Sequence, residues 1–435
     1  MLVTPNHSLP TRLGIPSLAP MPLTPSQSIK ETSSIDPSLV QDVAVGNVLR
    51  PSSAYMARSA VLAAGFPSST AASIVNRFCS SGLLAIQQIS TAISCGVIDV
   101  GIAAGVESMS TNADGGAPDN PALSEAILSH PIAKDNVMPM GWTSENVAGD
   151  FNVSREAMDE FAAESFQKAE KAQKEGWTAD EIAPVSTTFT DPKTKEKRDV
   201  VVDRDDGIRA NTTAAGLSKI RAAFPQWSPS HTTGGNASQI TDGAAAVLLM
   251  KRSTAEALGQ KILGKIVQTA IVGLEPRIMG IGPYYAIPKV LEKTGLKQEE
   301  VDVFEINEAF ASMVCFCAAE EGWGWLSGRV DSDPDSGAFL ITVLFTALAL
   351  LFAFPALQPS HARASWHAST HAYHAPALPL LPPLFPSLPS SPTILSIIPG
   401  NSSSLASSNS ARCRHHIALV RPRDQDSLTS PAPWT

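Results

Sequence analysis

The sequence predicts an α/β fold built around parallel strands. Residues 71–106 supply the first observation, because an apolar strand, a helix over about 80–95 and a second strand over 99–106 follow one another with short connections. Such a unit normally makes its two strands parallel and covers both sheet faces. Residues 244–250 supply the second, since a continuous apolar run is typical of a strand at a sheet centre.

Cys79 lies at the corner between the first strand and its helix. The unpaired N–H groups and the dipole at a helix start stabilise an anion, so a thiol there can become a ready thiolate. The alternative is a buried structural cysteine, which is the commoner state of a lone cysteine. The corner alone leaves both interpretations open.

Other elements follow from apolar periodicity and from capping residues. Ser154 is a good N-cap, and Gly176 and Gly295 are typical residues just past a helix end. Further strands are expected at 40–48, 262–272 and 301–306, and further helices at 59–64, 154–175 and 283–294.

Two segments lack a clear period. Residues 111–153 are rich in Asn, Asp, Gly and Pro, so we expect a long excursion of the kind that is usually functional. Residues 180–206 are charged and turn-rich, so we expect them at the surface.

Two short polar segments are candidate ligand sites. Residues 232–238 are small, which lets backbone approach a ligand closely, although an ordinary turn has the same composition. Asn307 and Glu308 follow the strand at 301–306, at the end where ligands bind in open α/β sheets. A simple helix cap is the alternative for that pair.

Composition excludes several functional classes. The net charge of −9 argues against a nucleic-acid binder or a polybasic membrane protein. The five cysteines have no framework spacing, so we expect a reducing compartment, no disulfides and no metal cluster. Residues 1–35 are rich in Ser and Pro, and the prolines rule out a continuous amphipathic helix, which favours a disordered extension over a transit peptide.

Seven motifs together resemble the thiolase family. Residues 76–82, Asn-Arg-Phe-Cys-Ser-Ser-Gly, match its nucleophile motif, in which Gln usually stands where this chain has Phe78. The other matching segments, in family order, are 105–110, 138–148, 206–209, 235–243, 278–283 and 305–311. The chain is most similar to 3-ketoacyl-CoA thiolases of peroxisomal β-oxidation, from about residue 30 to about residue 320.

The resemblance implies two similar α/β halves with mixed sheets and a loop domain inserted in the first half. We therefore expect an N-terminal thiolase domain at 36–255 with the loop domain at about 111–230, and an incomplete C-terminal domain at 256–322. Residues 323–435 resemble no part of the family, and we interpret them as sequence that does not code for thiolase. An alternative is a membrane span at 338–357, which is long enough, but it lacks basic flanks and contains Pro355.

The resemblance also implies an acyl transfer. The thiolate of Cys79 would attack the keto carbon of a 3-ketoacyl-CoA, release acetyl-CoA and carry the acyl group until free CoA removes it. Asn307 would position a water of the oxyanion hole. Other residues at positions that line the CoA channel or reaction pocket are Met140, Arg209, Ser238 and Phe310. CoA is a cosubstrate, and no metal or redox cofactor is implied.

This chain departs from the family after Phe310. Family members have a Gly-His-Pro motif, whose histidine activates the thiol, and a Cys-x-Gly motif, whose cysteine is the second acid/base. Neither motif is present, and Pro139 and Gly234 also depart from the residues expected in relatives. The missing motifs leave open a non-catalytic acyl-CoA-binding remnant. Within the family, the alternative is a biosynthetic acetoacetyl-CoA thiolase.

Partners and location are implied by the resemblance. We expect a homodimer that binds 3-ketoacyl-CoA and CoA, without nucleic acid and without membrane association. A peroxisomal location is expected, although neither the N-terminal import signal nor a final Ser-Lys-Leu is present. Without import, the location would be cytoplasmic.

Overall fold

The computed structural model describes residues 3–4, 33–50, 53–109, 123–177, 179, 182–191, 194–239, 241–301, 303–320 and 340–342. All of these residues belong to one compact unit. The expected tail at 323–435 falls outside them except for 340–342, and most of the expected extension at 1–35 does too. Residues 33–35 are part of the fold, since Ile35 is buried in the core. Across the described ranges, no helix has the length and apolar character needed to cross a membrane.

The main sheet is mixed, with strand order β1-β7-β4-β2-β3 in the described part of the chain. Strands β2, β3 and β4 are mutually parallel where they pair, whereas β7 is antiparallel to β4. The strands are β1 (Val3–Thr4), β2 (Asp42–Gly46), β3 (Ala71–Val75), β4 (Val100–Ser108) and β7 (Asp242–Met250). The expected parallel unit at 71–106 is confirmed, but β2 lies between its two strands.

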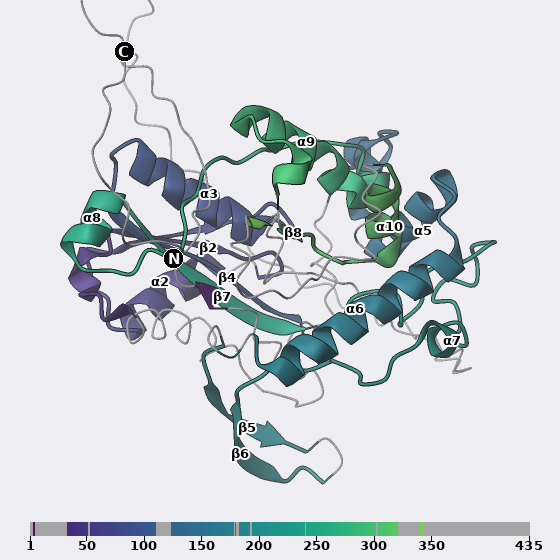
Figure 1. The fold of residues 1–435 in the computed structure, drawn as a ribbon, viewed down its shortest axis with the longest axis horizontal. Helices are drawn as coiled ribbons and strands as arrows, with labels where there is room; N and C mark the ends of the chain where they lie inside the picture. Colours follow the sequence, from purple (N-terminus) through teal and green to yellow (C-terminus); the bar gives the residue numbers. More distant parts are fainter. Residues whose placement is uncertain are drawn as a thin grey trace, which may run out of the picture. The chain divides into compact units, whose positions relative to one another are not determined.

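Two helices cover opposite faces of this sheet (Figure 1). Helix α2 (Ser53–Ala63) packs on the face that carries Val43 and Ile102, and α3 (Ser81–Ser94) packs on the face that carries Ala44 and Ala103. Successive side chains of a strand point to opposite faces. Strands that are apolar at consecutive positions therefore bury both faces, which is why β4 and β7 are nearly continuous apolar runs.

The segment between β4 and β7 contains more regular structure than expected. Its elements are α4 (Glu125–Leu128), η4 (Ala133–Val137), α5 (Met140–Asp150), α6 (Arg155–Glu175), β5 (Val185–Thr190), β6 (Lys197–Val202) and α7 (Ala214–Leu217). Helix α6 begins after the Ser154 cap and ends at Gly176, as expected. The hairpin of β5 and β6 was not expected, because it is largely exposed and its polar strands resemble a turn-rich surface segment (Figure 1).

Helix α5 corrects the expectation of an irregular excursion at 111–153. Seven of the eight residues at 141–148 are buried, and several of these are polar, among them Ser144 and Glu145. A helix that is buried on nearly all sides has no amphipathic stripe. The periodicity that predicts helices therefore could not reveal it.

A second core cluster joins η5 (Pro276–Ile281), α9 (Gly282–Thr294), β8 (Val303–Glu305) and α10 (Ala311–Glu320) to α5 and α6. The other described elements are η2 (Pro37–Leu39), α8 (Arg252–Ala257), η6 (Gln298–Glu300) and β9 (Leu340–Thr342). The strand expected at 262–272 is wrong. That segment has no regular secondary structure and pairs with no strand in the described residues, and only Val267 in it is buried. The helix expected at 59–64 begins earlier, at Ser53.

Candidate active site

Cys79 lies in a tight turn between β3 and α3, where the sequence placed it. The N–H of Arg77 donates to Ser81 Oγ at 2.9 Å, and Ser81 Oγ donates to the carbonyl of Phe78 at 2.6 Å. Phe78 has φ +47°, which is uncommon for a residue with a side chain. The two serines after Cys79 thus close the turn and start the helix, with Ser80 as its N-cap.

The start of α3 is held directly against the end of β2. A Cβ atom added to Gly46 would lie 2.5 Å from the carbonyl carbon of Ser81. Only glycine permits so close an approach of two backbones. Gly46 therefore determines where the turn that carries Cys79 lies relative to the sheet.

Four of the six residues that the sequence singled out line one pocket. They are Cys79, Met140, Asn307 and Phe310. Cys79 is 9% exposed and packs in the same apolar cluster as Phe310 and Met109. Arg209 and Ser238 are not among the residues that line this pocket. Arg209 is exposed, and the backbone N–H of Ser238 contacts Ala309, which lines the pocket.

The two candidate polar segments meet beside the pocket. The N–H of Ser238 donates to the carbonyl of Ala309 at 3.0 Å, and the N–H of Ala311 donates to the carbonyl of Asn236 at 2.9 Å. Residues 232–238 and 307–311 thus brace each other, although about 70 residues separate them along the chain. Glu308 turns to α6, where it accepts a hydrogen bond from Ser165.

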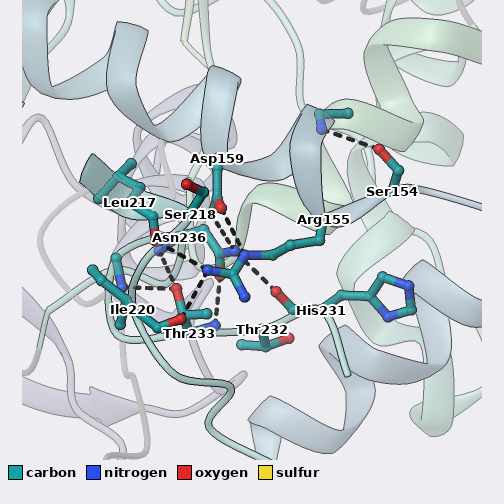
Figure 2. Close-up of polar contacts among 12 residues, drawn as sticks. Ser154, Arg155, Asp159, Leu217, Ser218, Ile220, His231, Thr232, Thr233 and Asn236 are labelled. Carbon is teal, nitrogen blue, oxygen red and sulfur yellow. Dashed lines mark hydrogen bonds and ion pairs between the residues drawn. The ribbon is translucent and has the colours of Figure 1, made fainter. Parts of the chain in front are cut away.

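An ionic contact between Arg155 and the buried Asp159 supports the loop at 232–238, as Figure 2 shows. Asp159 accepts from Arg155 Nε at 2.7 Å and from Asn236 Nδ2 at 2.9 Å. Arg155 also donates to the carbonyls of Leu217 and Ile220 at 3.0 Å. Helix α6 therefore fixes both the loop and the segment at 217–220 through one side chain pair.

Sequence patterns did not reveal a chain of three hydroxyls beside the pocket. Ser144 Oγ lies 2.8 Å from Ser312 Oγ and 2.8 Å from Thr232 Oγ1. Ser144 and Ser312 line the pocket, and all three residues are buried. Next to Ser144, the Glu145 carboxylate accepts the N–H groups of His231 and Thr232. Thr232 and Ser144 fall within segments that the sequence singled out, 232–238 and 138–148. No local pattern pairs these hydroxyls, because they lie on elements far apart in the chain.

The remaining described cysteines do not reach the pocket. Cys315 and Cys317 lie on α10, and neither is among the pocket-lining residues. Burial raises the pKa of the Cys315 thiol to about 12, so this sulfur stays protonated near neutral pH. Within the described ranges, no cluster of three or more His, Cys, Asp or Glu side chains could hold a metal ion.

Comparison with known proteins places this site in a family. The profile of the thiolase N-terminal domain matches residues 24–253, and that of the thiolase C-terminal domain matches residues 260–331. The chain belongs to the thiolase family. Its mixed sheet, with α2 and α3 on opposite faces, is the sheet of a thiolase fold.

Similar proteins include peroxisomal enzymes. This thiolase is 50% identical to the peroxisomal 3-ketoacyl-CoA thiolase A of Candida tropicalis over 299 residues, which are 67% of this chain and 70% of that protein. It matches the crystal structure of the dimeric peroxisomal thiolase of Saccharomyces cerevisiae with a TM-score of 0.66 and 38% identity, over 81% and 86% of the two chains. The acetyl-CoA acetyltransferase of Bacillus anthracis matches with a TM-score of 0.63 and 30% identity, over the same shares.

Proposed function

We propose that this thiolase is an acetyl-CoA C-acyltransferase that cleaves 3-ketoacyl-CoA with CoA in fatty acid β-oxidation. The observation that carries the proposal is the pocket in which Cys79 and Asn307 lie with Met140 and Phe310. One nucleophile, one amide and an apolar lining suit a reactive acyl group. The 50% identity to a peroxisomal 3-ketoacyl-CoA thiolase favours this activity over the biosynthetic alternative and the non-catalytic remnant.

Cys79 is the proposed nucleophile. Its sulfur forms a bond to the keto carbon of the substrate, and the bond between carbons 2 and 3 breaks to release acetyl-CoA, whose carbon 2 takes up a proton. The sulfur of free CoA then attacks the resulting thioester, and Cys79 leaves as a thiolate. A thiolate suits both steps, since it is a strong nucleophile and a good leaving group.

The other site residues have binding roles in this proposal. Asn307 holds a water that donates to the oxygen on which negative charge develops. Met140 and Phe310 form the apolar wall around the acyl group. Arg209 and Ser238 contact CoA outside the pocket, a role that fits the exposure of Arg209 and the attachment of the Ser238 backbone to Ala309.

Proton transfer sets this chain apart from the family pattern. The described residues that line the pocket include no histidine, no second cysteine and no carboxylate. The thiol proton and the proton that acetyl-CoA takes up therefore pass through water or through the hydroxyls of the wall. We expect slower turnover than in relatives that contain the Gly-His-Pro and Cys-x-Gly motifs. A positioned acid or base typically raises the rate by roughly 10²–10⁴-fold.

A homodimer in the peroxisome completes the proposal. Strand β3 is the edge strand of the described sheet, next to the turn that carries Cys79, and an edge strand is a template for pairing with a second chain. The similar yeast thiolase is dimeric and peroxisomal. Sedimentation of the purified chain would show the dimer.

The test compares the purified full-length wild-type chain with its Cys79→Ala variant. CoA-dependent loss of a 3-ketoacyl-CoA is followed by its enolate absorbance, and the acyl group on Cys79 is detected by peptide mass spectrometry. Thiolysis and an acylated Cys79 peptide, both lost in Cys79→Ala, are expected. Binding of 3-ketoacyl-CoA without either signal would instead establish the non-catalytic remnant.

A further inference from the structure

The carboxyl group of Glu107 has no part in the mechanism above, yet it is one of the most buried acidic groups in the described chain. Glu107 is the penultimate residue of β4 and is 2% exposed. Its Oε2 accepts the N–H of Val48 at 3.0 Å, the N–H of Leu49 at 3.3 Å and the side-chain amide of Asn47 at 3.4 Å. These three consecutive residues directly follow the end of β2, so one carboxyl oxygen binds every residue of the segment at 47–49.

The same segment supports the turn that carries the nucleophile. Asn76 Nδ2 donates to the carbonyl of Val48 at 3.3 Å, and Asn76 Oδ1 accepts the N–H of Phe78 at 2.9 Å. The N–H of Asn47 also donates to the carbonyl of Val75, at 3.2 Å. An unbroken series of hydrogen bonds thus runs from Glu107 through residues 47–49 and Asn76 to the residue before Cys79.

Packing follows the same path. Leu49 and Cys79 belong to one buried apolar cluster, together with Met109, which lies two residues beyond Glu107. A shift of residues 47–49 would therefore move the wall against which the nucleophile packs as well as the hydrogen bonds of its turn.

The turn needs such support because its backbone is strained. Phe78 has a positive φ and its side chain is 62% exposed, so its own packing contributes little to this conformation. Strained residues cost about 1–3 kcal/mol each and persist only where the surroundings over-determine them. Hydrogen bonds from Asn76 and from the serines that follow Cys79 hold Phe78 in this conformation.

We propose that Glu107 is a positioning residue that sets the reactivity of Cys79 by holding residues 47–49 beneath the nucleophile turn. Glu107 does not line the pocket, so it acts through Asn76 and never touches substrate. Its role in thiolysis rests on the function proposed above, but its effect on Cys79 does not require turnover.

The test measures the rate at which iodoacetamide alkylates Cys79 in the full-length chain, resolved by peptide mass spectrometry. The two relay variants each change one residue of the series of hydrogen bonds between Glu107 and Phe78. Glu107→Gln keeps the shape of the side chain, and Asn76→Ala removes an exposed side chain together with its hydrogen bonds to Val48 and Phe78. Val61→Ala is the matched control, since it destabilises a different core cluster, which contains neither Leu49 nor Cys79. We expect both relay variants to change the alkylation rate about tenfold or more, since a misplacement of about 1 Å can cost up to about 100-fold in rate. We expect Val61→Ala to leave the rate unchanged.

The outcomes separate the two proposals. An altered Cys79 rate in both relay variants supports the positioning role, even where wild-type chain shows no thiolysis and the proposed function fails. If thiolysis is measurable, kcat should fall in both variants while KM changes little. Unchanged alkylation rates in Glu107→Gln and Asn76→Ala, with Glu107→Gln merely as unstable as Val61→Ala, would overturn the proposal and leave Glu107 a structural residue.

Discussion

Ser144 on α5 and Ser312 on α10, which both line the pocket, share a hydrogen bond of 2.8 Å between their hydroxyls. Ser144 also contacts Thr232 at 2.8 Å, so it is the centre of a chain of three hydroxyls. The pair joins two helices whose positions along the chain differ by 168 residues.

Replacing the central hydroxyl should cost more than replacing either end. We expect Ser312→Ala and Thr232→Val to lower the free energy of unfolding by about 1 kcal/mol each, and Ser144→Ala by about twice that, because it removes two hydrogen bonds. Urea denaturation measures all three. In the double variant Ser144→Ala/Ser312→Ala the loss should be smaller than the sum, and strict additivity would show that the hydroxyls act independently.

Gly46→Ala should displace the start of α3. The new Cβ would lie 2.5 Å from the Ser81 backbone, which cannot yield as a flexible side chain would. We expect a loss of about 1–3 kcal/mol in thermal or urea unfolding, together with slower alkylation of Cys79. Gly149→Ala is the matched control: this exposed glycine in α5 has nothing within 4 Å of its added Cβ, and a gain of about 0.5–1 kcal/mol is expected there. Equal effects at both positions would contradict the close approach.

The described cysteines should differ sharply toward iodoacetamide. At about pH 8, exposed Cys95 should react readily. Cys315 should stay unmodified, since burial raises its pKa to about 12, and Cys317 is fully buried. Peptide mapping after brief labelling of the folded chain tests this order, and labelling in urea is the control for intrinsic reactivity. Labelling of Cys315 as fast as that of Cys95 would refute its burial.

Stability should depend on pH through Glu107. Desolvation raises the pKa of this carboxyl above its ordinary value of 4.5, and it outweighs the hydrogen bonds from Val48 and Leu49, which act in the opposite direction. The folded chain therefore holds this proton more tightly than the unfolded chain does. The resulting stabilisation is complete below pH 4.5 and is lost as the pH rises through the folded pKa.

Glu107→Gln, which cannot ionise, isolates that effect. The free energy of unfolding of the wild type minus that of Glu107→Gln should decrease as the pH rises above 4.5. Urea denaturation at a series of pH values measures this difference. A difference that stays constant with pH would mean that the folded and unfolded chains titrate Glu107 alike.

Local signals in the sequence were reliable where the structure is local. The corner at Cys79, the cap at Ser154 and the helix ends at Gly176 and Gly295 depend on neighbours within one turn of chain, and all are found where expected. The apolar run at 244–250 was equally clear, because a strand that is buried on both faces excludes polar residues.

The same local patterns did not predict features that depend on contacts between distant parts of the chain. Helix α5 lacks a stripe because it is buried on nearly all sides, and the segment at 262–272 is apolar but pairs with no described strand. Whether an apolar run becomes a strand depends on a partner elsewhere in the chain, which its own composition does not reveal.

The sequence by itself determined the family and the order of its motifs, and it predicted Cys79 as the nucleophile, because each of these inferences rests on contiguous residues. The tertiary structure alone decided that Cys79 shares a pocket with Asn307, that three hydroxyls from distant elements are hydrogen-bonded beside it, and that Glu107 binds the segment that contacts the turn of Cys79. The physical reason is that hydrogen bonds and packing join groups by distance in space, whereas periodicity records only distance along the chain.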